Sequence, residues 1–128
     1  MLTIMSSVRF KYWLFDFISN IFRCLIFHRH ATILSDDDNT DDYQSVIDTN
    51  FAGLVNCTKF AFQLMKKLDD YGHIININSI YGHGVPIVST DPRTNVYSGT
   101  KHAITATTEI IRQELNFLKN KKVRVSVS

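Results

Sequence analysis

Apolar side chains recur every three or four positions along two long stretches, residues 41–68 and 96–118. This spacing predicts two amphipathic helices, because it gathers the apolar side chains on one face of each. The acidic residues at 41–42 suit a first helical turn, and the lysine-rich run 119–122 suits a last one, since both complement the helix dipole. The positions that we expect to face inward are Val46, Ile47, Phe51, Leu54, Val55, Phe62, Met65 and Leu68 in the first helix, and Ala103, Ile104, Thr107, Ile110, Ile111, Leu115 and Leu118 in the second.

Two short runs of branched apolar residues, 73–79 and 123–127, predict strands. In the first run, Ile74, Ile75 and Ile77 place apolar side chains on both faces, which is typical of a buried parallel sheet. Residues 31–34 are expected to form a short strand end, and residues 80–95, with their glycines and prolines, a loop. The order helix, strand, helix, strand favours an α/β fold with a parallel sheet.

Residues 1–30 differ from the rest of the chain. Positions 8–27 are dense in large apolar side chains, but Lys11, Asp16 and Arg23 interrupt the run, which argues against a membrane-spanning helix. The pattern favours a core helix, a helix that covers a partner, or a segment foreign to the domain. An anchor on a membrane surface is the alternative.

Composition narrows the class of protein. The 128 residues are 45% apolar and 20% charged, as expected for one small globular domain. A net charge of +2 gives no reason to expect a nucleic-acid partner. Two cysteines exclude a disulfide scaffold, and the five histidines lack metal-ligand spacing, so we expect no metal site and a reducing compartment, the cytoplasm.

Four residues are candidates for chemistry. Tyr97 and Lys101 are four positions apart, so a helix places them on one face, where the ammonium favours the ionised form of the phenol. A tyrosine so placed can exchange a proton with a hydroxyl or carbonyl group. Ser79, at a strand end, can hold the same oxygen. Asn50 lies inside a helix, which is a poor place for asparagine unless its side chain is used.

These residues occur in a recognisable order. The segments are Asn50-x-x-Gly53, Gly-x-Ile-Ile-Asn-x-x-Ser at 72–79, and Tyr97-x-x-x-Lys101. Together they closely resemble the short-chain dehydrogenase/reductase family. The particular residues within and around these segments resemble its insect farnesol dehydrogenase-like branch. The resemblance covers residues 31–128 and implies part of a Rossmann-like, doubly wound parallel sheet.

The resemblance also implies roles. Ser79 would orient the substrate oxygen, Tyr97 would be the general acid/base, and Asn50 would anchor a water in the proton relay. Lys101 would assist Tyr97, and both would contact the cofactor, NADP or NAD. The substrate would be an alcohol or carbonyl compound, such as the terpenoid alcohol farnesol. The two long helices would support a homo-oligomer.

The chain also departs from the family pattern. The family opens with a Thr-Gly-x-x-x-Gly-x-Gly turn that meets the cofactor pyrophosphate, and this sequence contains no such motif. We therefore expect residues 31–128 to be the middle of a family domain that lacks the N-terminal cofactor-binding half, preceded by unrelated residues 1–30, as in a truncated gene model or transcript. The alternative to an active oxidoreductase is an inactive fragment that retains the catalytic helix and the dimerisation region.

Overall fold

The computed structural model describes residues 33–34, 41–69, 71–85, 87 and 96–128, and it confirms the predicted order of elements. Two helical stretches alternate with two strands, as expected for an α/β fold. The elements are α2 (Asp41–Ile47), a π-helical turn (Asp48–Ala52), α3 (Gly53–Leu68), β1 (Gly72–Asn76), a 3₁₀ turn (Ile80–Gly82), α4 (Tyr97–Phe117) and β2 (Val123–Val127).

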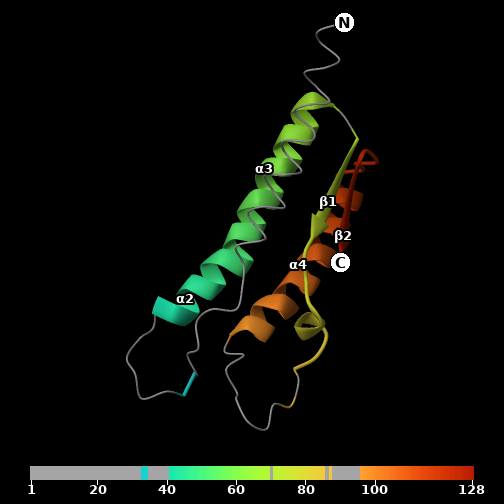
Figure 1. The fold of residues 1–128 in the computed structure, drawn as a ribbon. Coiled ribbons are helices and arrows are strands. Elements are labelled where there is room, and N and C mark those ends of the chain that lie inside the picture. Colours follow the sequence, from blue (N-terminus) through green and yellow to red (C-terminus); the bar gives the residue numbers. More distant parts are fainter. Residues whose placement is uncertain (1–32, 35–40, 70, 86, 88–95) are drawn as a thin grey trace, which may run out of the picture.

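The two strands form a parallel sheet in which α4 is the crossover connection (Figure 1). The register runs from Gly72 opposite Val123 to Asn76 opposite Val127. This pairing continues just past β1, because Asn78 N–H donates to Ser128 O at 3.2 Å. The predicted strand 123–127 is confirmed, whereas the first strand ends at Asn76 rather than at Ser79.

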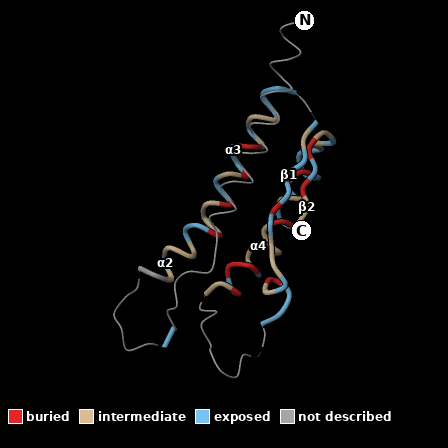
Figure 2. Tube along the Cα trace, in the orientation of Figure 1, coloured by how far each residue is buried: buried red, intermediate tan, exposed pale blue. Residues whose placement is uncertain are grey.

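Both long helices pack on one face of this sheet, where the buried residues gather (Figure 2). Gly72 opens β1 directly beneath the end of α3, and a Cβ atom there would lie 2.2 Å from Sδ of Met65. A larger residue at this position would therefore have to displace the flexible end of the Met65 side chain. The core consists of Ala61, Ile74, Leu115, Val123 and Val125, with Phe62, Met65 and Ile111 packed against it.

The opposite face of the sheet is open among the described residues. Ile75 is 36% exposed and Ile77 is 43% exposed. The prediction that β1 is buried on both faces is therefore wrong for this chain, because α3 and α4 cover the same side. The helices are also buried over a narrower stripe than the spacing predicted, and four of the expected inward positions are exposed: Val55, Leu68, Ile110 and Leu118.

The first helix is not a single regular α-helix. α2 and α3 are joined by the π turn, on both sides of which the backbone stays helical, at Ile47 and at Ala52. α3 ends at Leu68 and is capped by Asp69, which has a left-handed backbone (φ 50°) and whose N–H binds carbonyls of the last turn. Ile33 and Leu34 lie in a turn, so the expected strand end is not found at these two residues.

Several expectations fall outside the described residues: the apolar segment 1–30 with its 8–27 stretch, and most of the loop before α4. Among the helices that the structure does describe, none has the length and apolar character needed to cross a membrane.

Candidate active site

The π turn places Asn50 against the first turn of α4. Asn50 is buried, and its Nδ2 donates to Oγ1 of Thr100 at 3.1 Å. Thr100 Oγ1 in turn donates to the carbonyl oxygen of Tyr97 at 2.7 Å. The side chain of Asn50 is therefore used, as its unfavourable mid-helix position suggested, and its direct partner is a threonine of α4.

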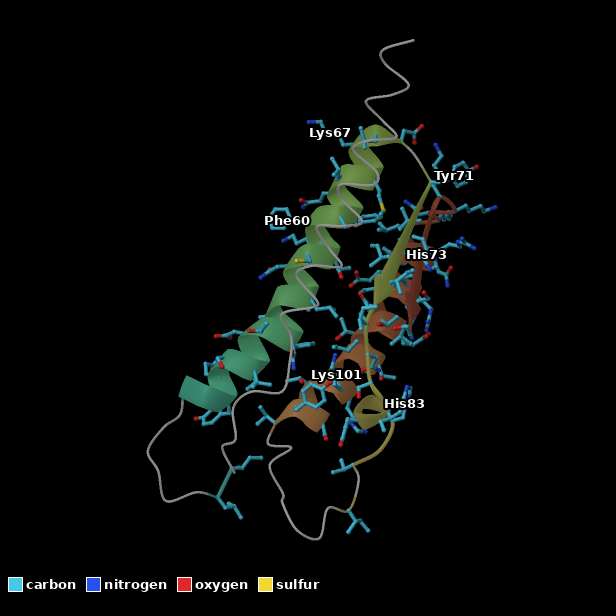
Figure 3. The ribbon with its side chains drawn as sticks, in the orientation of Figure 1. Phe60, Lys67, Tyr71, His73, His83 and Lys101 are labelled. Atoms are coloured by element: carbon cyan, nitrogen blue, oxygen red, sulfur yellow. The ribbon has the colours of Figure 1, made fainter. Side chains whose placement is uncertain are left out.

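Tyr97, the first residue of α4, and Lys101 lie one helical turn apart on the same face, as their spacing predicted. The Nζ atom of Lys101 is 5.5 Å from the centroid of the Tyr97 ring, within cation–π range. The same Nζ donates to the carbonyl oxygen of Ile77 at 3.1 Å. Lys101, labelled in Figure 3, is only 3% exposed, and this burial lowers its pKa from the ordinary lysine value.

Ser79 follows β1 and caps the 3₁₀ turn. Its Oγ accepts the backbone N–H of Tyr81 at 3.3 Å, and its carbonyl oxygen accepts the N–H of Gly82 at 2.9 Å. The ring of Tyr81 packs edge-on against the ring of Tyr97, with centroids 5.7 Å apart and planes at 76°. Tyr81 therefore connects Ser79 to Tyr97.

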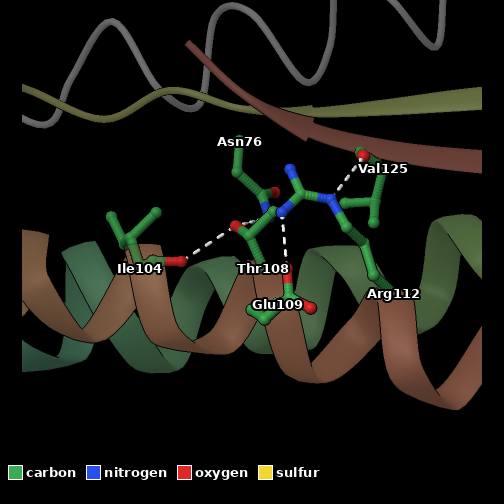
Figure 4. Close-up of polar contacts among 6 residues, drawn as sticks. All are labelled: Asn76, Ile104, Thr108, Glu109, Arg112 and Val125. Carbon is green, nitrogen blue, oxygen red and sulfur yellow. Dashed lines mark hydrogen bonds and ion pairs between the residues drawn. The ribbon is translucent and has the colours of Figure 1, made fainter.

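Sequence reasoning missed the polar side chains through which α4 contacts β1 and the residues after it. Asn76 Nδ2 donates to Thr108 Oγ1, and Asn78 Nδ2 donates to Thr105 Oγ1, each at 2.8 Å. Figure 4 shows the first of these bonds, together with the bond that Thr108 donates to the carbonyl oxygen of Ile104 at 2.8 Å. One signal was present in the sequence: two asparagines alternate within an isoleucine-rich strand and so share one of its faces.

The structure thus brings the four predicted residues towards the first two turns of α4. Tyr97 and Lys101 are in direct contact, Ser79 reaches Tyr97 through Tyr81, and Asn50 is linked to Tyr97 through Thr100. Their catalytic roles stay predictions. In the described part of the chain, no group of three His, Cys, Asp or Glu residues is placed to hold a metal ion.

Comparison with known proteins assigns the fold to a family. Residues 27–128 match the family model of the short chain dehydrogenases. The chain is 43% identical over 97 residues to a farnesol dehydrogenase of Aedes aegypti, an alignment covering 76% of this chain and 37% of that protein. It is 46% identical over 88 residues to the human dehydrogenase/reductase SDR family member 11, covering 68% and 32%, and 46% identical over 81 residues to the Gallus gallus protein of that name, covering 62% and 31%. The chain spans about a third of the length of these relatives. Because the family model covers most of the chain, the protein belongs to the short-chain dehydrogenase family.

Proposed function

We propose that these residues are the proton-transfer centre of an oxidoreductase that interconverts an alcohol and a carbonyl compound. The observation that supports this most strongly is the buried ammonium of Lys101, 5.5 Å from the ring of Tyr97. A phenol beside a buried cation can exchange a proton with an alcohol, because the positive charge attracts the negative charge that develops on the reacting oxygens. In the reverse direction the phenol donates that proton to the carbonyl oxygen.

Ser79 is proposed to hold the reacting oxygen. Its Oγ already accepts the N–H of Tyr81, and within the described part of the chain its own O–H is donated to no other residue. The hydroxyl is therefore set to donate to a substrate oxygen beside Tyr97. Asn50 is proposed to anchor a water in the proton relay. The turn that contains it is wider than an α-helical turn, because Gly53 N–H donates five residues back to Asp48 O, and this changes the hydrogen bonding of the backbone carbonyls around Asn50.

The chemistry of this family requires a nicotinamide cofactor, NADP or NAD, which supplies or accepts the hydride. Lys101 fits such a group. Its ammonium can donate three hydrogen bonds, and among the described residues it makes one, to Ile77 O. We propose that the remaining N–H groups of Lys101 bind hydroxyls of the nicotinamide ribose, and that Tyr97 lies beside the nicotinamide ring.

The substrate is proposed to be a largely apolar alcohol such as farnesol. The Aedes relative named as a farnesol dehydrogenase supports this class. So does the character of the residues that follow Ser79 in the chain, because Ile80, Val85 and Ile87 all carry exposed apolar side chains. We also propose a cytoplasmic location, since Cys57 is a free thiol.

A second proposal is that the chain is an inactive fragment that associates through its long helices, with itself or with a relative. Phe60 on α3 is 70% exposed, and Ile110 on α4 is also exposed. Exposed large apolar side chains on neighbouring helices favour association. Analytical ultracentrifugation of the wild type and of Phe60→Ser tests this, and a monomer at every concentration contradicts it.

The two proposals are separated by cofactor binding and turnover. Calorimetry with NADPH and NADH measures binding to the purified chain, and cofactor absorbance measures turnover with farnesol. We expect Tyr97→Phe to lower turnover by about 10²- to 10⁴-fold, with an unchanged circular dichroism spectrum. Tyr71→Phe, at an exposed tyrosine, is the control. Absence of cofactor binding leaves the fragment proposal, and equal turnover in Tyr97→Phe removes Tyr97 from the mechanism.

A further inference from the structure

The segment that carries Ser79 is fastened to one face of α4 by three side-chain hydrogen bonds. Lys101 Nζ binds Ile77 O at 3.1 Å, two residues before Ser79. Asn78 Nδ2 donates to Thr105 Oγ1 at 2.8 Å, and Thr105 Oγ1 lies 3.1 Å from the carbonyl oxygen of Gly82. Lys101 and Thr105 are one helical turn apart, so both contacts come from the same face.

Thr105 is the residue that holds both sides of Ser79. Its hydroxyl accepts from Asn78, immediately before Ser79, and has one proton left to donate. Two acceptors are within reach, Gly82 O at 3.1 Å and the helix carbonyl of Lys101 at 3.4 Å, and the shorter contact is the one to the 3₁₀ turn. A single hydroxyl thus bridges the residue before Ser79 and the residue three positions after it.

Gly82 closes this arrangement. A Cβ atom on Gly82 would lie 2.5 Å from both Nδ2 and Oδ1 of Asn78, so the amide rests directly against the glycine backbone. The Oδ1 atom of Asn78 is buried and has no hydrogen-bond partner among the described residues. An unpaired buried acceptor costs stability, and such a cost persists where the geometry itself is used.

We propose that Asn78, Thr105 and Gly82 form a clasp that positions Ser79 against Tyr97 and Lys101. The inference rests on the function proposed above, since it gives Ser79 and Tyr97 a common substrate oxygen. Thr105 is a positioning residue in this scheme. It contacts the side chain of Asn78 before Ser79 and the backbone of Gly82 after it, and it acts through Ser79. Displacement of this segment by about 1 Å is enough to lower turnover substantially.

The first test measures the clasp without relying on activity. The amides of Tyr81 and Gly82 donate to the side chain and backbone of Ser79, so their hydrogen exchange reports the position of this segment. We expect Thr105→Val to speed exchange at these two amides about tenfold, with Ile74 unchanged. Thr105→Ser, which keeps the hydroxyl, restores slow exchange.

Thr107→Val is the matched control, since Thr107 is half-buried on the same helix and its side chain makes no hydrogen bond to another described residue. Unchanged exchange at Tyr81 and Gly82 in Thr105→Val overturns the proposal. So does an equal increase at every amide, which indicates a loss of global stability alone.

A second pair of variants reaches the clasp from the other side. Gly82→Ala forces the Asn78 amide away from Thr105, and we expect the same local increase in exchange. Gly84→Ala adds the same methyl group two residues later, where a Cβ meets nothing within 4 Å, and should leave exchange unchanged. Equal behaviour of the two alanine variants overturns the role of Gly82.

Measurements of turnover distinguish the positioning role of the clasp from the proposed oxidoreductase function. With farnesol and NADP, we expect Thr105→Val to lower kcat about 10- to 100-fold with KM within about twofold, and Thr105→Ser to recover most of it. If Thr105→Val speeds amide exchange at Tyr81 and Gly82 but the wild type shows no turnover, the clasp is supported and the proposed function is contradicted. Local exchange that changes while kcat does not overturns the positioning role and leaves the proposed function standing.

Discussion

The two halves of α4 are held to the rest of the fold by different means. In the first half, up to Thr108, three asparagines outside the helix donate hydrogen bonds to its threonines. In the second half, Ile111 and Leu115 pack with the valines of β2 and with α3. The candidate catalytic residues lie entirely in and around the polar half.

This difference separates position from stability. Hydrogen bonds fix distances and directions within a few tenths of an ångström, but each adds only about 1 kcal/mol net. Apolar contacts are non-directional, and they contribute most of the free energy of folding. The apolar half of α4 is therefore expected to hold the helix on the sheet, and the polar half to set where the reactive groups lie.

The largest stability effect is expected in the apolar half. Leu115→Ala removes a buried side chain from the core and should lower the free energy of unfolding by about 2–5 kcal/mol, measured by urea denaturation. Leu118→Ala is the control, because Leu118 is the exposed residue that follows α4, and it should change the free energy of unfolding by under about 0.5 kcal/mol. Similar losses in both variants would show that the core does not hold this end of the helix.

A smaller loss is expected from the polar half. Thr108→Val keeps the shape of the side chain but leaves the buried Nδ2 of Asn76 without its acceptor. We expect a loss of about 1–3 kcal/mol in the free energy of unfolding. Thr108→Ser should restore most of it. A valine variant as stable as the wild type would mean that the Asn76–Thr108 bond adds nothing net.

The pH dependence of the free energy of unfolding, compared between the wild type and Lys101→Met, tests the polar half of α4. Burial lowers the pKa of Lys101 in the folded chain, whereas an unfolded lysine titrates at about 10.4. Below the folded pKa both states carry the proton, and the wild type bears the full cost of burying the charge. Between the two pKa values the unfolded chain binds more protons, so the stability of the wild type rises with pH.

The quantity to measure is the free energy of unfolding of the wild type minus that of Lys101→Met, which should increase as pH rises from 7 towards 10. Lys59→Met, at an exposed position of α3, corrects for the loss of one positive charge. If this difference in unfolding free energy fell as the pH rose, it would contradict the burial of the Lys101 ammonium group.

The smallest effect is expected at the surface of α4. Glu109 and Arg112 form an exposed ion pair at 2.8 Å, and Nε of Arg112 also donates to Val125 O at 3.4 Å (Figure 4). Exposed pairs contribute little, so Glu109→Gln should leave the urea midpoint unchanged within error. A clear shift would mean that the apolar half also depends on polar contacts.

Local periodicity predicted most of the elements. The two helical stretches and the two strands lie within the ranges that the spacing predicted, although β1 ends at Asn76 and a π turn interrupts the first helix. The contact of Tyr97 with Lys101 follows from helical geometry alone. The family was also identified from short motifs, because Asn50 and Ser79 occur at the expected places relative to that pair.

What the sequence did not predict depends on contacts between distant residues. Thr105 and Thr108 look like ordinary helical threonines, and only the folded chain brings them to Asn78 and Asn76, about 30 positions away. Likewise, the exposure of Ile75 depends on which face of the sheet the helices cover. Spacing within one strand cannot encode that choice.

The π turn at Asp48–Ala52 has an evolutionary consequence. Such a turn holds one residue more than the α-helical turn it replaces, so deleting a single residue there would yield a regular helix. Because the π turn accommodates that extra residue within a single wider turn, α2 and α3 would keep nearly the same orientation relative to each other. The deletion would instead remove the wider turn from which Asn50 reaches Thr100. A one-residue deletion here would therefore spare the burial of Leu54 and act on the polar contact with the first turn of α4.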